Sequence, residues 1–119
     1  MMNQHPYQTC LEACQACAVA CDQCADACLH EQSIAMLANC IRLDRDCARI
    51  CITAVSYMAA NSQFAASVCE LCARICDECA AECEKHADRH EHCRICAEAC
   101  RRCADECRAM VDLTDVAHS

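Results

Sequence analysis

Cysteine recurs along this chain at alternating steps of three and four residues, and that spacing limits the possible fold more than any other feature. Residues three and four apart lie on one side of an α-helix, so each run of cysteines predicts a helix with a thiol-lined face. Three runs are dense and one, around Cys47, is sparse. The nineteen positions are Cys10, Cys14, Cys17, Cys21, Cys24, Cys28, Cys40, Cys47, Cys51, Cys69, Cys72, Cys76, Cys79, Cys83, Cys93, Cys96, Cys100, Cys103 and Cys107.

The residues between the cysteines are mostly Ala, Glu, Asp, Arg and Gln, and most of these favour helix. The expected helices lie near 6–30, 33–60, 62–86 and 88–113, followed by a loose tail at 114–119. Connections this short force neighbouring helices to run antiparallel. Residues 1–119 therefore predict a single all-α domain, an antiparallel up-down four-helix bundle with a Cys-lined core.

Composition narrows the possible functions. The chain has no Gly, which phosphate-binding loops and dinucleotide-binding turns require. Its formal net charge of −8 argues against a nucleic-acid partner. The sequence shows neither a secretory signal at its start nor an uncharged apolar run long enough to span a membrane. We therefore expect a cytoplasmic protein without a membrane partner, in a compartment where thiols stay reduced and serve metal binding more often than disulfides.

Nineteen thiols in one helical register indicate metal binding rather than packing, disulfides or redox catalysis. Neighbouring thiols on one helix have Cβ atoms about 5–6 Å apart, too far for an unstrained disulfide. Pairs such as Cys14 and Cys17 lie within helices, unlike the exposed Cys-x-x-Cys pair that follows a strand in thioredoxin-like enzymes. Zinc favours closed sites of four ligands, whereas soft Cu(I) selects sulfur and accepts two or three ligands.

The sequence therefore favours storage of many Cu(I) ions per chain, without catalytic activity. Two alternatives stay open at this point. One is a zinc- or cadmium-sequestering protein with metallothionein-like chemistry, and the other is an iron–sulfur or redox carrier. The Cys-x-x-Cys-x-x-x-Cys spacing is similar to that of ferredoxins, but the fourth Cys followed by Pro is missing.

With these residues the chain closely resembles the cytosolic bacterial copper storage proteins, which are four-helix bundles with Cys-lined interiors. The resemblance extends from Cys10 to Met110, and the tandem Cys-x-x-Cys-x-x-x-Cys arrays are its specific part. It implies that all nineteen cysteines are Cu(I) ligands and that one chain binds many ions. It also implies a homotetramer of bundles.

The two ends of the predicted bundle differ in composition. We expect the His-rich end to be the mouth through which metal passes, with Met36, His86 and His90 as uptake ligands. His30 and His92 are interpreted as solvated loop residues. The opposite end is interpreted as a hydrophobic plug. Its members are Tyr7, Tyr57, Met58, Phe64, Met110, Val111 and Leu113.

The helix expected near 33–60 departs from the cysteine pattern in two ways. Asp44 stands where the other helices carry Cys, and it either faces the core or turns outward toward Arg42 or Arg45. Hard oxygen is a poor Cu(I) ligand, so we favour a structural role for it beside the thiols. A second apolar stripe either packs on a neighbouring helix or forms an oligomer contact, to which the resemblance assigns it. Its members are Ile34, Leu37, Ile41, Ala48, Ile52 and Val55.

Overall fold

A computed structural model describes residues 6–118, with side-chain surroundings for 6–113. Within that part the chain forms four long helices and one short one, and the predicted all-α fold is confirmed. They are α1 (Gln8–Leu29), the 3₁₀-helix η1 (Ile34–Leu37), α2 (Ala38–Ala59), α3 (Ala65–Glu84) and α4 (Glu91–His118).

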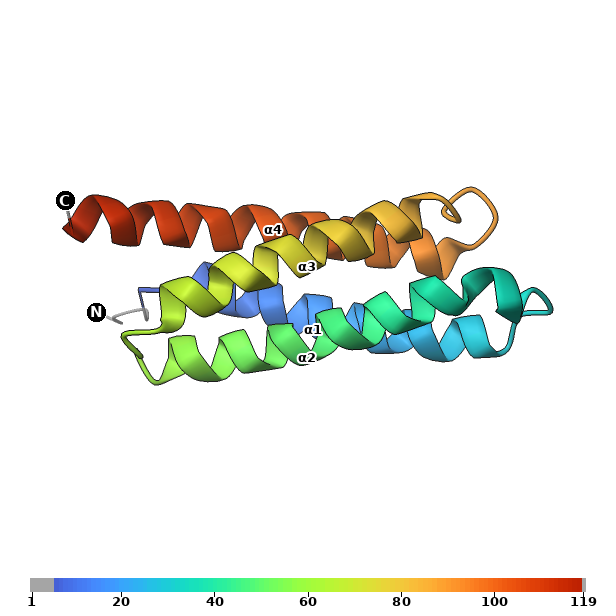
Figure 1. Ribbon diagram of the computed structural model, residues 1–119, viewed down its shortest axis with the longest axis horizontal. Coiled ribbons are helices and arrows are strands. Elements are labelled where there is room, and N and C mark those ends of the chain that lie inside the picture. The colour runs from blue at the N-terminus through green and yellow to red at the C-terminus, as the bar shows by residue number, and fades with distance from the viewer. Residues whose placement is uncertain (1–5, 119) are drawn as a thin grey trace, which may run out of the picture.

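The four long helices form a ring in which each packs against the two that adjoin it, in the order α1, α2, α3, α4. Figure 1 shows them running along the long axis of a particle of 50 × 29 × 20 Å, alternating in direction. Helix α1 begins and α4 ends at the same end of the bundle. The η1 segment and the α3–α4 connection lie at the opposite end, which is the end that the sequence predicted to be rich in His.

The sequence predicted each helix start too early. Helix α2 begins only after η1, and α4 begins at Glu91 rather than 88. Before α3, the Oγ of Ser62 accepts a hydrogen bond from the Phe64 N–H at 3.0 Å, and the helix follows at Ala65. The C-terminal residues expected as a tail continue α4 as far as His118. The short helix η1 and the connections therefore contain residues that helical periodicity alone assigned to the long helices.

The α2–α3 turn shows how a chain without Gly ends a helix. Asn61 adopts a left-handed conformation with φ of 53°. Its N–H bonds to the Met58 carbonyl at 3.0 Å, and the Ser62 N–H bonds to the Tyr57 carbonyl at 3.0 Å. This pair of bonds is the Schellman arrangement, which usually has Gly at the left-handed position and sometimes Asn. Asn61 therefore supplies the sharp reversal that places α3 antiparallel to α2.

The core is made mostly of cysteine and alanine. All nineteen cysteines are buried, none more than 3% exposed, and the larger buried apolar side chains are Leu37, Met58 and Met110. The helices present Cys to the centre because Cys occupies the inward positions of the three–four spacing. Outward positions carry the charged residues, so the thiols are closed off from solvent along the length of the bundle.

Candidate metal centre

The sulfur atoms of different helices lie as close together as those of one helix. Between α2 and α3, the sulfurs of Cys47 and Cys76 are 3.4 Å apart, and between α4 and α1 those of Cys103 and Cys14 are 3.5 Å apart. Within α1, by comparison, the sulfurs of Cys17 and Cys21 are 3.9 Å apart. The ring of helices therefore adds cross-helix sulfur pairs at shorter range than the pairs that the spacing along one helix provides.

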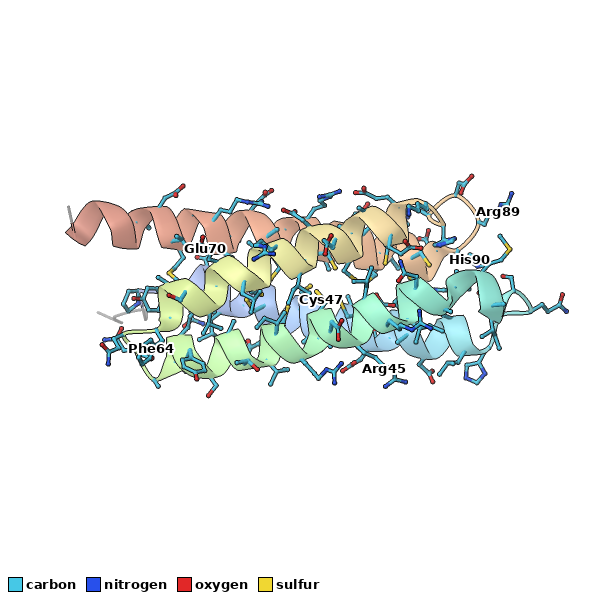
Figure 2. All side chains as sticks on the ribbon, in the orientation of Figure 1. Arg45, Cys47, Phe64, Glu70, Arg89 and His90 are labelled. Carbon is cyan, nitrogen blue, oxygen red and sulfur yellow. The ribbon has the colours of Figure 1, made fainter. Side chains whose placement is uncertain are left out.

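These pairs merge into groups of four sulfurs whose atoms all lie within 4.8 Å of one another. Adjacent groups share members, so the array is continuous rather than divided into separate sites. In Figure 2 the labelled Cys47 lies near mid-length, and sulfur atoms gather between the ribbons around it. Three of the groups are Cys17, Cys47, Cys51 and Cys76; Cys17, Cys21, Cys47 and Cys100; and Cys21, Cys79, Cys96 and Cys100. All nineteen thiols are free in the structure.

Burial raises the pKa of the thiols, whereas thiol–thiol hydrogen bonds lower the pKa of some thiols and raise that of others. Burial is the largest influence on Cys28 and raises the pKa of its thiol to about 12. Hydrogen bonding to Cys107 is the largest influence on Cys103 and lowers the pKa of that thiol to about 7. Thiols such as Cys103 reach the thiolate form, the form that binds metal, more readily than an ordinary thiol. At thiols whose pKa is raised, such as Cys28, a soft cation that replaces the proton stabilises the thiolate.

Asp44 faces the sulfur array. Its Oδ1 accepts hydrogen bonds from Cys79 and Cys96 at 3.2 Å each and from Cys83 at 3.6 Å. Its Oδ2 accepts one from Cys40 at 3.8 Å. The side chain is fully buried, and it takes the inward position that Cys occupies on the other helices.

Of the two interpretations of Asp44, the inward one agrees with the structure and the outward one, toward Arg42 or Arg45, is wrong. Burial first, and then the neighbouring thiols, raise the pKa of the Asp44 carboxyl to about 11. Asp44 is therefore a neutral acid at neutral pH in the metal-free protein. The same carboxyl can donate its proton to a neighbouring sulfur that has lost its own.

His92 was misinterpreted from the sequence as a solvated loop residue. It lies in the first turn of α4, and its Nδ1 is 3.6 Å from the sulfurs of both Cys24 and Cys93 and 3.9 Å from that of Cys28. These four residues form one of the compact ligand groups. The sequence signal that could have found His92 is its place directly before Cys93, at the start of a cysteine-lined helix.

The expected uptake residues all lie at the His-rich end, but they differ in their surroundings. Met36, in η1, is 64% exposed. The Nε2 of His86 lies 3.1 Å from Glu82 Oε2, and the Nδ1 of His90 lies 3.1 Å from Glu31 Oε2. Figure 2 shows His90 at the end of the bundle opposite Phe64. His30, in contrast, is highly exposed beside Asp26, as expected for a solvated residue.

Two carboxylates at this end were not identified from the sequence. Glu82 is buried and also accepts hydrogen bonds from Asn39 at 3.0 Å and Lys85 at 3.1 Å. Glu31 accepts from His92 as well as from His90. His86, His90 and His92 are therefore each held by a carboxylate. The sequence predicted that these His residues share one end of the bundle, but it did not predict their carboxylate partners.

The residues of the expected plug, and those of the second apolar stripe along η1 and α2, are only partly buried. At the plug end Met58 and Met110 are buried, but Phe64 is 56% and Leu113 is 69% exposed. In the stripe, Leu37 and Ala48 are buried, as the packing interpretation expects. Ile34 and Ile52 remain 42% and 57% exposed, and Ile52 lines a shallow hollow between α1 and α2.

A ring of four helices around a continuous buried array of thiols defines a binding protein for soft metal ions. The array itself consists of sulfur, with one imidazole and one carboxyl beside it, and Cu(I) is the ion that such sulfur selects. A family model described as copper storage protein matches residues 3–112. The chain belongs to the copper storage protein family, and the identification from the sequence is confirmed.

Solved structures agree with the family. The chain is 49% identical to the Cu(I)-bound copper storage protein BsCsp3, with a TM-score of 0.81 over 86% of this chain and 94% of that one. It is 47% identical to apo copper storage protein 3 from Bacillus subtilis, with a TM-score of 0.80 over 87% and 97%.

A third structure, of a cytosolic copper storage protein from Streptomyces lividans with five coppers, is 43% identical, with a TM-score of 0.85 over 89% of this chain and 92% of that one. None of the curated proteins compared with the chain matches it. Within residues 6–118, no helix combines the length and the apolar character that crossing a bilayer requires.

Proposed function

We propose that this protein stores Cu(I) in the cytoplasm, with its nineteen cysteines as the ligands and without catalytic activity. The observation that carries the proposal is the sharing of sulfurs between neighbouring four-sulfur groups. Shared thiolates allow many ions to bind along one array, which a chaperone, sensor or enzyme with a single site does not need. The similarity to the cytosolic protein from Streptomyces lividans supports the location.

The charge of the interior favours Cu(I) over a divalent ion. Each Cu(I) that binds a thiolate replaces one thiol proton, which leaves to solvent, so the buried array keeps its net charge. A divalent ion with four thiolates instead leaves two excess negative charges at each site, and burying such charge is costly. Zinc or cadmium sequestration and an iron–sulfur carrier are therefore the less favoured functions.

An anaerobic titration of the fully reduced protein with Cu(I), in competition with a chromogenic chelator, tests the proposal. We expect tight uptake that approaches one Cu(I) per Cys, and we expect Cu(I) to displace zinc in a parallel titration. The loaded protein should stay colourless, since Cu(I) thiolates lack the brown colour of iron–sulfur clusters. Saturation at one to four ions would contradict storage and favour a chaperone, sensor or cluster carrier.

We infer that the His-rich end is the mouth and that Met36, His86 and His90 bind Cu(I) on its way to the thiols. Support comes from their position: Met36 is exposed, and both His residues lie in the connection between α3 and α4, shortly before the first cysteines of α4. His92, whose Nδ1 faces Cys24 and Cys93, is then the ligand where the mouth joins the array.

Replacing His86 and His90 together by Ala is expected to slow Cu(I) loading on the order of tenfold, as loss of groups around a metal site does, and to leave the capacity nearly intact. Stopped-flow transfer from a Cu(I)-chelator complex measures the rate. His30→Ala is the matched control, because His30 lies at the same end but is exposed and contacts Asp26. Unchanged loading kinetics in the double variant would refute the assignment of the mouth.

We also propose that the protein is a homotetramer, as the resemblance to the family implies. The exposed Ile34, in η1, and Ile52, in α2, support a contact on this side of the bundle, because exposed apolar surface can mark an interface. The buried members of the same stripe, Leu37 and Ala48, belong to the packing of the single chain. Each chain holds its own complete sulfur array, so the proposed capacity per chain does not depend on the assembly.

A further inference from the structure

One carboxylate oxygen joins two His rings at the mouth. Oε2 of Glu31 lies 2.9 Å from Nε2 of His92 and 3.1 Å from Nδ1 of His90. The two ring centroids are 5.3 Å apart, and all three side chains are at most one-third exposed. Glu31 follows α1 and His92 belongs to the first turn of α4, so this contact also ties the α1–α2 connection to the start of α4.

The chemistry of the carboxylate determines which nitrogen of each ring carries the proton. A Glu carboxyl is ordinarily ionised at neutral pH, and an ionised carboxylate accepts hydrogen bonds and donates none. Both ring nitrogens that face Oε2 must therefore be N–H donors. In the neutral rings this leaves a lone pair on Nδ1 of His92 and on Nε2 of His90.

The two rings are thus held in opposite tautomers. Nδ1 of His92, the nitrogen with the lone pair, is the one 3.6 Å from the sulfurs of Cys24 and Cys93. The neutral side chain of free histidine favours the Nε2–H tautomer, so His92 keeps the common form. His90 is held in the less common Nδ1–H form, which places the Glu31 hydrogen bond and the available lone pair on opposite sides of its ring.

We propose that Glu31 is a positioning residue for copper uptake, which sets the tautomers and orientations of His90 and His92 so that Nε2 of His90 and Nδ1 of His92 are available to Cu(I). Carboxylates that accept the second N–H of a metal-binding His are a general feature of metal sites and fix both tautomer and ring orientation. Here a single carboxylate does so for two rings at once. The inference rests on the proposed Cu(I)-binding function of the two His residues.

The first test uses the reduced, copper-free protein and reads the tautomers directly. Nitrogen NMR of the imidazole rings, under anaerobic and mildly alkaline conditions, is expected to show Nδ1–H for His90 and Nε2–H for His92. In Glu31→Ala, His90 is expected to revert to the Nε2–H form. Asp26→Ala is the matched control, because it removes a carboxylate beside a different His, His30, and should leave both tautomers unchanged.

The second test adds Cu(I) in competition with a chelator and follows the Nδ1 resonance of His92, since Cu(I) is diamagnetic. We expect the apparent affinity at His92 to fall about tenfold in Glu31→Ala, as losses of such supporting groups do, and to stay unchanged in Asp26→Ala. Glu31→Gln removes the charge but keeps an acceptor oxygen, so its affinity should lie closer to that of the unaltered protein.

Three outcomes would overturn the inference. The first is a His90 ring without a proton on Nδ1, and the second is a Glu31→Ala variant with unchanged tautomers. The third is a Glu31→Gln variant that keeps the tautomers but loses as much affinity as Glu31→Ala, because charge alone would then be responsible. If Cu(I) leaves His92 Nδ1 unshifted in the unaltered protein, the proposed ligand role of His92 fails instead, and the copper-free tautomers distinguish that failure from the others.

Discussion

Loading with Cu(I) is expected to raise the melting temperature of this protein by at least about 20 °C. An ion that binds only the folded chain at a free concentration of 1,000 times its Kd stabilises it by about 4 kcal/mol. For a domain of this size each 1 kcal/mol raises the melting temperature by about 4 °C or more, and several ions add their effects. Circular dichroism at increasing temperature, under anaerobic conditions, measures the difference between loaded and metal-free protein.

The size of this effect follows from the composition of the core. Without metal, the bundle is held together by small Cys and Ala side chains and few large apolar ones, whereas bound ions link sulfurs of different helices. Protein stripped by a chelator and reloaded serves as the control and should regain the higher melting temperature. Equal melting temperatures for loaded and stripped protein would mean that copper binds the unfolded thiols as well as the folded array, contrary to a preformed store.

Asp44→Asn is expected to stabilise the metal-free protein, and increasingly so as the pH rises. In the folded chain the pKa of Asp44 is raised from 3.8 to about 11. Between these values the folded chain keeps a proton that the unfolded chain releases, so the contribution of Asp44 to stability falls as the pH rises. At 1.36 kcal/mol per pH unit, the advantage of the variant should grow by about 3 kcal/mol from pH 5 to pH 7.

Urea unfolding of the reduced proteins at both pH values measures this difference. Carboxylates whose pKa is lowered, such as Glu31 and Glu84, make the folded protein more stable as the pH rises. This contribution is the same in both proteins, so it cancels when the unfolding free energy of the unaltered protein is subtracted from that of the variant. Asp46→Asn is the matched control, because Asp46 lies two residues further along α2, is exposed and pairs with Arg49 at 2.7 Å. A difference that stays constant with pH would show that Asp44 titrates as an ordinary carboxyl in the folded chain.

The fold followed from the sequence because one signal, the alternating spacing of Cys, specifies both the helical period and the inward face. The helix ends were less accurate because they depend on local turns. The Schellman reversal at Asn61 and the 3₁₀ turn before Ala38 arise from backbone hydrogen bonds that periodicity does not report. The same spacing correctly predicted that the thiols lie in the core.

The surroundings of the individual site residues could not be read from the sequence. Spacing along one helix does not show how far each helix is rotated about its axis or shifted along it relative to its neighbours. That rotation and shift place the sulfur of Cys47 beside the sulfur of Cys76. His92 and Glu31 are 61 residues apart, and only the closing of the ring places them together. Asp44 was found by its register, but its four thiol partners come from three helices.

The sharing of sulfurs between adjacent groups has a consequence for oxidative damage. Three of the four-sulfur groups use eight different cysteines, where separate groups would use twelve. Cys100 belongs to two of them, so oxidation of that one thiol to a sulfinic acid, which is in general irreversible, removes a ligand from both. Sharing therefore lets fewer cysteines form more metal-binding groups, but each oxidised thiol weakens more than one group. The burial of every thiol protects the array against such oxidation.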